Sequence, residues 1–180
     1  MNTGISALLD GGLLHLQAGE LFDALKKFDA VLAKVSDHPD ALWLKGVALL
    51  QLDQIEGAVS LLEQAHQFRP ADAAICNDLG MALEAAKKLT EAASYFDKAA
   101  HLNPDMAHVY VNIARLALNR NDTNTALSTV TRAIELEANQ SVAHNVKGNV
   151  MRKLGRMDEA LAAYEVALST DPGNVEAQLN

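Results

Sequence analysis

Residues 73–106 read AAICNDLGMALEAAKKLTEAASYFDKAAHLNPDM, and this stretch decides the fold. Four residues of its first half recur at helical spacing and share one face of an α-helix: Cys76, Leu79, Gly80 and Leu83. Three residues of its second half follow the same rule: Ala92, Phe96 and Ala99. Pro104 then ends the second helix, because a proline inside a helix removes a backbone hydrogen bond. The stretch therefore predicts two helices joined by a short turn.

The same unit recurs along the chain with a period of 34 residues. Its small residue recurs as Gly12, Gly46, Gly80, Ala114 and Gly148. Its alanine, twelve residues later, recurs as Ala24, Ala58, Ala92, Ala126 and Ala160. Two series that keep one period over five copies indicate a tandem array of one helix pair. No copy can bury its own apolar face, so we expect stability to come from stacking of neighbours.

The sequence thus predicts an all-α solenoid of five antiparallel helix pairs, in a single domain over residues 1–180. The predicted repeats cover about residues 5–38, 39–72, 73–106, 107–140 and 141–174, and a further, capping helix begins within 175–180. The fourth junction lacks the proline that closes most of the others, so we expect Ser141 or Asn139 to cap the helix that follows.

A turn between the two helices of each pair falls at one position of the period: Gly19, Asp53, Lys87, Asn121 and Gly155. Glycine, asparagine and aspartate tolerate the left-handed backbone that such a turn often requires. Lys87 does not share this property. We therefore expect either backbone strain or a looser turn at Lys87.

Composition excludes several classes of function. The formal net charge is −8, from 23 acidic and 15 basic residues, which argues against a nucleic-acid or anionic-membrane partner. No apolar run is long enough to insert into a membrane. Residues 1–20 have no basic segment and carry Asp10 within their apolar part, unlike a signal peptide. With a single cysteine, Cys76, we expect a cytoplasmic protein without disulfides.

We expect no catalytic, cofactor or metal site. Acidic residues are scattered over the outer helix faces, and no phosphate-cradling glycine loop is present. Serine and histidine nowhere form a pattern typical of an activated nucleophile. The chain is therefore not expected to be an enzyme.

The chain resembles the tetratricopeptide-repeat family over about residues 5–174. The two series above carry the resemblance, together with a bulky residue at Phe28, Leu62, Phe96, Val130 and Tyr164 and the prolines Pro70, Pro104 and Pro172. The resemblance implies a right-handed superhelix whose first helices line a concave groove. In this family, that groove usually holds a peptide or a helix of a partner protein.

Helical geometry identifies which side chains of the first helices face away from the packing stripe. They lie three residues before the small residue and one, four and five residues after it. The candidate partner-binding residues at these positions, with Asn112 alongside, are Leu13, Trp43, Val47, Leu50, Asn77, Met81, Asn112, Arg115, Asn145, Asn149 and Arg152. The same positions also hold Leu9, Leu16, Gln17, Gln51, Glu84, Val111, Leu118, Asn119 and Lys153.

The candidate surface is apolar in its N-terminal half and rich in Asn and Arg in its C-terminal half. Asparagine amides both donate and accept, which suits an extended peptide backbone, and the resemblance implies a short ladder of Asn112, Asn145 and Asn149. Arg115 and Arg152 favour acidic groups on the partner. Two structural alternatives stay open: Trp43 as ordinary core, and the asparagines as solvated polar residues.

The leading hypothesis is a protein-interaction module that holds a peptide or helix of a partner. The co-chaperone members of the family clamp an acidic tail, but Val142 and Val146 stand where that clamp needs basic residues. One alternative is a self-assembling scaffold (a homo-oligomer) that uses the apolar first repeats or the end after residue 174. Another is a recruiting domain of a larger or associated enzyme.

Overall fold

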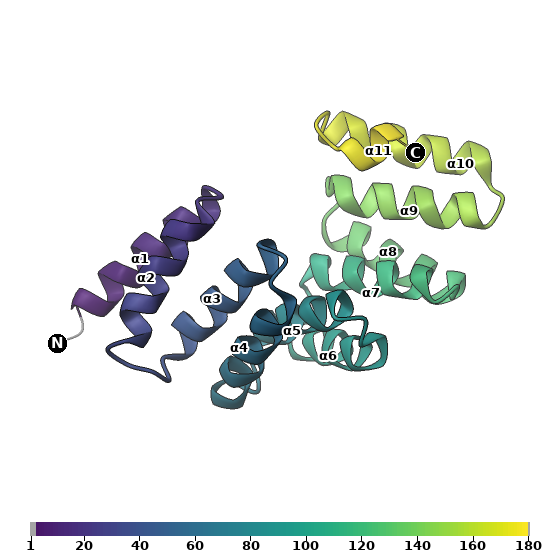
Figure 1. Cartoon of the computed structure of the whole chain (residues 1–180). Helices are drawn as coiled ribbons and strands as arrows, with labels where there is room; N and C mark the ends of the chain where they lie inside the picture. Colours follow the sequence, from purple (N-terminus) through teal and green to yellow (C-terminus); the bar gives the residue numbers. More distant parts are fainter. Residues whose placement is uncertain (1–2, 180) are drawn as a thin grey trace. The chain divides into compact units, whose positions relative to one another are not determined.

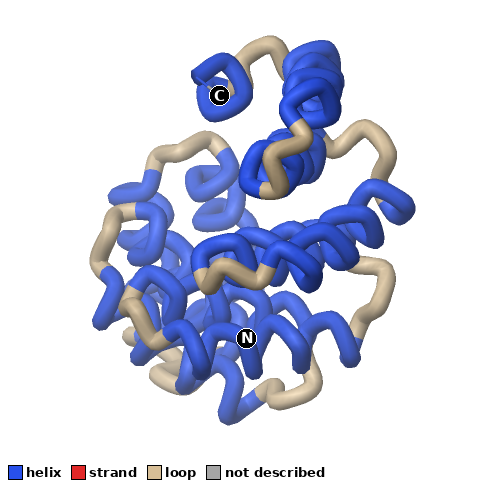
Figure 2. The backbone as a smooth tube through the Cα atoms, turned by 90° about the vertical axis from the view of Figure 1, so that its right-hand side faces the viewer, coloured by secondary structure: helices blue, strands red, loops and turns tan. Residues whose placement is uncertain are grey.

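A computed structural model describes residues 3–179, apart from the side chains of Thr3 and Glu176. Within this range the chain forms α-helices joined by short loops and contains no strand (Figure 1, Figure 2). The helices are α1 (Thr3–Gln17), α2 (Leu21–Leu32), α3 (Pro39–Gln51), α4 (Ile55–Phe68), α5 (Ala73–Ala85), α6 (Leu89–Leu102), α7 (Ala107–Asn119), α8 (Thr123–Leu136), α9 (Ser141–Lys153), α10 (Met157–Thr170) and α11 (Val175–Leu179). Each predicted repeat contains two of them, which confirms the all-α fold of five helix pairs. None of the helices in 3–179 combines the length and apolar character needed to cross a bilayer.

Contacts between residues divide the chain into two compact units, one up to Tyr95 and one from Phe96 onward. The boundary falls within α6, so α1 to α5 belong to the first unit and α7 to α11 to the second. In each unit, a helix packs against the partner of its own pair and against the first helix of the next pair, as in α1–α2–α3 and α7–α8–α9. The single domain over 1–180 stays a prediction.

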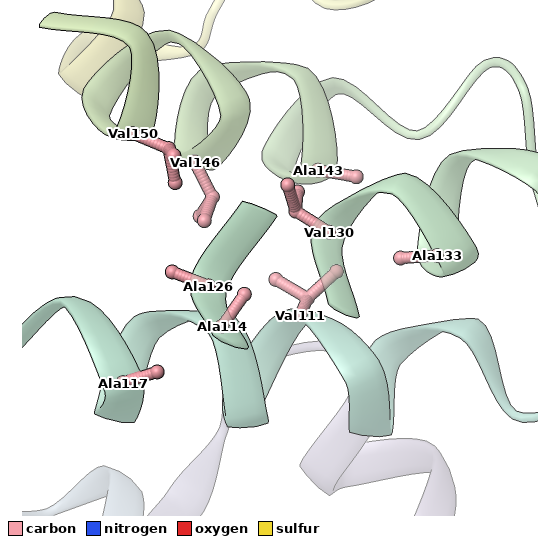
Figure 3. Packing of buried hydrophobic residues seen from close by; sticks show 9 residues of the cluster. All are labelled: Val111, Ala114, Ala117, Ala126, Val130, Ala133, Ala143, Val146 and Val150. Carbon is pink, nitrogen blue, oxygen red and sulfur yellow. The ribbon is translucent and has the colours of Figure 1, made fainter. Parts of the chain in front are cut away.

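The core of the second unit shows how neighbouring pairs stack (Figure 3). Nine small or β-branched side chains from three successive helices form one buried cluster: Val111, Ala114, Ala117, Ala126, Val130, Ala133, Ala143, Val146 and Val150. The first three come from α7, the next three from α8 and the last three from α9. Their small volume lets three helices meet without a large cavity, which explains the abundance of alanine in the sequence.

In three of the pairs, the glycine of the first helix lies beneath the bulky residue sixteen positions later. A Cβ atom placed on Gly12 would lie 2.5 Å from Cε1 of Phe28, and one placed on Gly46 would lie 2.8 Å from Cγ of Leu62. Both distances are shorter than a van der Waals contact. The glycines therefore set how closely the two helices of a pair approach.

All five turn residues between the paired helices have a positive φ: Gly19, Asp53, Lys87, Asn121 and Gly155. At Lys87, φ is 63°, close to the 58° of Asp53. The amide of Lys88 donates to Leu83 O at 2.9 Å, as the amide of Gln54 does to Leu49 O. The expectation of a looser turn is therefore wrong, and the strained alternative holds, because Lys87 adopts a left-handed backbone in a turn of normal length.

The start of α9 differs from the prediction that Ser141 or Asn139 caps this helix. The cap position is Gln140, which makes no side-chain cap hydrogen bond. Ser141 Oγ instead donates to Ala167 O at 2.9 Å, in the last turn of α10, and accepts from Asn174 Nδ2 at 2.7 Å. Asn174 Oδ1 in turn accepts from the amide of Ala177 at 3.0 Å. Ser141 thus satisfies a carbonyl at the end of α10 and helps to position the start of α11.

Gly12 and its neighbour Gly11 offer a matched test of close packing in one helix. Gly12→Ala should lower the free energy of unfolding by about 1–2 kcal/mol, because the overlap with Phe28 outweighs the gain in helix propensity. Gly11→Ala should raise it by about 0.5–1 kcal/mol, because a Cβ at Gly11 meets only Lys27 Cε at 3.9 Å. Urea denaturation of the three proteins measures both changes. Equal effects of the two substitutions would contradict the packing role.

Lys87→Gly should raise the free energy of unfolding by about 0.5–1 kcal/mol, because glycine removes the Cβ clash of the left-handed backbone. Lys87→Ala is the control, since alanine removes the charge but keeps the Cβ, and it should bring no gain. Thermal denaturation followed by circular dichroism distinguishes the two. A similar gain from both variants would point to the charge of Lys87 and not to its backbone.

Candidate functional site

A pocket of about 380 Å³ lies in the second unit. Six residues from the C-terminal halves of α7 and α9 line it: Arg115, Leu118, Asn119, Asn149, Arg152 and Lys153. They occupy the positions one, four and five residues after Ala114 and Gly148, which the sequence places away from the packing stripe. The structure thus brings together Arg115, Asn149 and Arg152 of the candidate set.

The lining of this pocket is strongly basic. Arg115, Arg152 and Lys153 contribute positive charge, and the six lining residues include no acid. The whole chain carries a net charge of −8, so this concentration of cations is a local feature. A basic concavity of this kind favours an acidic group.

Hydrogen bonds within the second unit hold three of the lining side chains. Lys153 Nζ donates to Leu118 O at 2.9 Å, which joins the last turn of α9 to the last turn of α7. Arg152 Nη2 donates to Asn149 Oδ1 at 3.3 Å. The hydroxyl of Tyr164, from α10, donates to the same oxygen at 2.8 Å. Asn149 is therefore fixed from two sides.

Tyr164 connects the helix packing to the pocket. Its side chain is buried, and its ring occupies the space in which a Cβ on Gly148 would clash. Burial raises the pKa of the Tyr164 hydroxyl above its ordinary value, although the positive charge of Arg152 acts in the opposite direction. The hydroxyl therefore stays protonated at neutral pH and can donate to Asn149.

Trp43 contributes to the contact between the second and third helix pairs. Its indole N–H donates to Asp78 Oδ2 at 2.7 Å, and the guanidinium of Arg69 lies 5.6 Å from its ring centroid. The ring packs against the core clusters that contain Leu42 and Leu44, and it is half-buried. Trp43 is thus largely a packing residue with a remaining exposed edge.

The other apolar candidates lie in the first unit with different exposures. Leu13 is exposed, whereas Leu50 and Met81 are half-buried. Val47 packs against the core cluster that contains Phe28. The sulfur of Met81 accepts a hydrogen bond from Asn77 Nδ2 at 3.6 Å.

The asparagines differ from the surface ladder that the resemblance implies. Asn145 has no exposed surface, and Asn77 and Asn112 are only 3% and 7% exposed. All three make interactions within the chain. A partner cannot reach Asn145, so the expected ladder of Asn112, Asn145 and Asn149 is not present. Asn149 is the member that lies at the pocket.

Sequence reasoning missed Tyr164 as part of the site. The available signal was its hydroxyl: the residues one to four periods earlier, Val130, Phe96, Leu62 and Phe28, have none. No group of three or more His, Cys, Asp or Glu side chains within the described range is arranged to hold a metal ion.

Comparison with known families identifies the architecture. A family model described as the N-terminal TPR repeats region of Psidin matches residues 15–116, more than half of the chain. Models described as tetratricopeptide repeat match residues 83–150 and 141–174. The chain belongs to the tetratricopeptide-repeat family. Members of this family are protein-interaction modules.

Several known proteins are similar to this chain in sequence. A BBSome complex member BBS4 homolog from Drosophila melanogaster is 26% identical over 96% of this chain and 36% of that protein. Hsp70-Hsp90 organizing protein 1 from Glycine max is 30% identical over 71% of this chain and 22% of that protein. The Protein STIP1 homolog from Dictyostelium discoideum is 34% identical over 55% of this chain and 18% of that protein. The chain thus spans about a third or less of the length of these relatives.

Solved structures share the tetratricopeptide-repeat fold. TTC0263 from Thermus thermophilus, a thermophilic TPR protein, superposes with a TM-score of 0.85 at 21% identity, covering 97% of this chain and 95% of that one. YrrB, described as a TPR protein with an unusual peptide-binding site, gives a TM-score of 0.70 at 19% identity, covering 96% and 89%. At these identities the similarity shows the fold alone.

Proposed function

We propose that the chain binds a peptide or helix of a partner protein along the exposed face of its first helices, and that the pocket between α7 and α9 receives an acidic group of that partner. The basic lining of this pocket carries the proposal. Three cations gathered on one concave surface favour an acidic ligand even in an acidic protein, because short-range contacts outweigh distant, screened charges. In the first unit, the proposed apolar contacts are Leu13, Trp43, Val47, Leu50 and Met81.

The relatives support a protein partner. One of them is named as an Hsp70-Hsp90 organizing protein, and YrrB is described as having a peptide-binding site. The proposal does not extend to the acidic-tail clamp of co-chaperones. Val142 and Val146 stand at its basic positions, and Val146 is buried in the core of the second unit.

We also propose a non-enzymatic role in the cytoplasm. The family consists of interaction modules, and the single cysteine of the sequence, Cys76, is buried, which fits a reducing compartment. The net charge of −8 disfavours nucleic acid as the partner. The same pocket would serve equally in a recruiting domain whose partner is an enzyme.

Self-association is a second candidate function, supported by the apolar surface of α10. Met157 and Leu161 lie one helical turn apart and are 57% and 59% exposed. Leu127, one period before Leu161, is half-buried against the cluster that contains Met151 and Tyr164. Leu161 is thus exposed at a position that is packed in the preceding repeat, and together with Met157 it suits contact with a second copy of the chain.

The first proposal is tested by selecting peptides that bind the whole chain from a displayed library of random sequences. We expect the selected peptides to be rich in Asp and Glu. Replacing both Arg152 and Lys153 with Gln should weaken binding about tenfold by fluorescence anisotropy, because two charge-assisted contacts are lost. Lys87→Gln with Lys88→Gln, which removes two adjacent exposed charges elsewhere, should leave affinity unchanged. Selected peptides without acidic residues, or equal loss in both variants, would refute the pocket.

Light scattering over a concentration series tests self-association. The wild-type mass should rise with concentration, and Leu161→Glu should keep the chain monomeric, because it places a charge in the apolar contact. Phe22→Glu changes an apolar residue of α2 that is 69% exposed and serves as the control, which should still associate. A wild-type chain that stays monomeric at the highest concentration removes this candidate.

A further inference from the structure

The hydroxyl of Tyr164 breaks the repeat pattern at the pocket. At the same position of the period, Phe28, Leu62, Phe96 and Val130 have side chains of carbon alone. Tyr164 fills it with a ring and adds one polar atom, which bonds Asn149 Oδ1 at 2.8 Å. Packing does not need this hydroxyl, since phenylalanine serves at two of the other positions.

The chemistry of the two partners fixes the orientation of the Asn149 amide. Arginine can only donate hydrogen bonds, so the Asn149 atom that faces Arg152 must be the oxygen. The hydroxyl of Tyr164 reaches the same oxygen and therefore donates as well. With Oδ1 occupied twice, the Asn149 amide offers a partner only the two N–H groups of Nδ2.

The α9 side of the pocket is consequently a surface of donors. Lys153 and Arg152 carry only N–H groups, and Asn149 adds the N–H groups of its amide. A group that can only accept hydrogen bonds suits such a surface. A carboxylate meets this requirement, whereas a carboxamide of the same shape brings an N–H₂ group that would face further donors.

We propose that the pocket between α7 and α9 binds a carboxylate of the partner peptide and rejects the corresponding carboxamide, with Tyr164 as the positioning residue that turns Asn149 into a donor. The proposal rests on the proposed function, since it names the chemical group that the interaction module recognises. The planar guanidinium of Arg152 and the amide of Asn149 suit the two oxygens of a planar carboxylate. Phosphate, like carboxylate, accepts hydrogen bonds. Arg152 and Lys153 already donate within the chain, however, and this favours the singly charged carboxylate over phosphate.

Paired peptides test this selectivity. Peptides selected on the whole chain are synthesised with each Glu or Asp replaced by Gln or Asn, and with a free or an amidated C-terminus. For each peptide, one of these acid-to-amide replacements should weaken its binding to the wild-type chain by more than tenfold, as measured by fluorescence anisotropy. In Tyr164→Phe the ring still fills the space over Gly148, so the melting temperature should stay near that of the wild type, while the preference for the acid falls about fivefold.

Two further variants complete the test. Tyr110→Phe removes a hydroxyl that bonds Pro104 O elsewhere in the second unit, and it should keep the full preference. Asn149→Asp replaces the donor amide by an acceptor, and it should abolish the preference for the acid even if Tyr164→Phe proves unstable. Phosphoserine peptides and inorganic phosphate are measured as competitors, and stronger competition by phosphate than by acetate would overturn the choice of carboxylate.

The outcomes separate the two proposals. Equal affinity for every acid and its amide would overturn the carboxylate proposal and leave the interaction module intact. Full acid preference in a folded Tyr164→Phe protein would overturn the positioning role of Tyr164. Failure of every selected peptide to bind the wild-type chain would overturn both the carboxylate site and the proposed function.

Discussion

The close approach of two paired helices, as at Gly12, Gly46 and Gly148, is the contact on which the structure depends. A residue without a side chain on the first helix leaves room for a bulky side chain on the second, as Gly12 does for Phe28 and Gly46 for Leu62. The bulky side chain then needs no cavity and no bend in either helix. Because the period carries this pair along the chain, the spacing between helices is set once and repeated.

The fourth and fifth pairs show how this contact varies and what the variation allows. In the fourth pair, Ala114 replaces glycine and the smaller Val130 replaces the ring, so both lie within one core cluster (Figure 3). In the fifth pair, Gly148 leaves room for the largest side chain of the series, Tyr164. Only a ring of that length carries a hydroxyl to Asn149, the residue that follows Gly148. The scaffold contact and the pocket are therefore neighbours in sequence for a physical reason.

The sequence predicts backbone features here better than side-chain environments. Helix pairs and left-handed turns follow from spacing and from local steric rules, and even Lys87 obeys the period despite its cost. The helical positions of Arg115, Asn149 and Arg152 also follow from spacing. Burial of Asn145 does not, because it depends on the neighbouring helices that enclose it. Likewise, no local rule states that the hydroxyl of a core tyrosine reaches a polar residue on another helix.

Charge alone cannot make this pocket selective. At physiological ionic strength the Debye length is about 8 Å, so acidic residues farther than this from the pocket are largely screened there. The same screening limits long-range attraction by its three cations, and electrostatic steering contributes little to encounter. Discrimination must then arise at hydrogen-bond distance, where the direction of each donor matters. A single amide held in one orientation contributes more to such discrimination than another surface charge would.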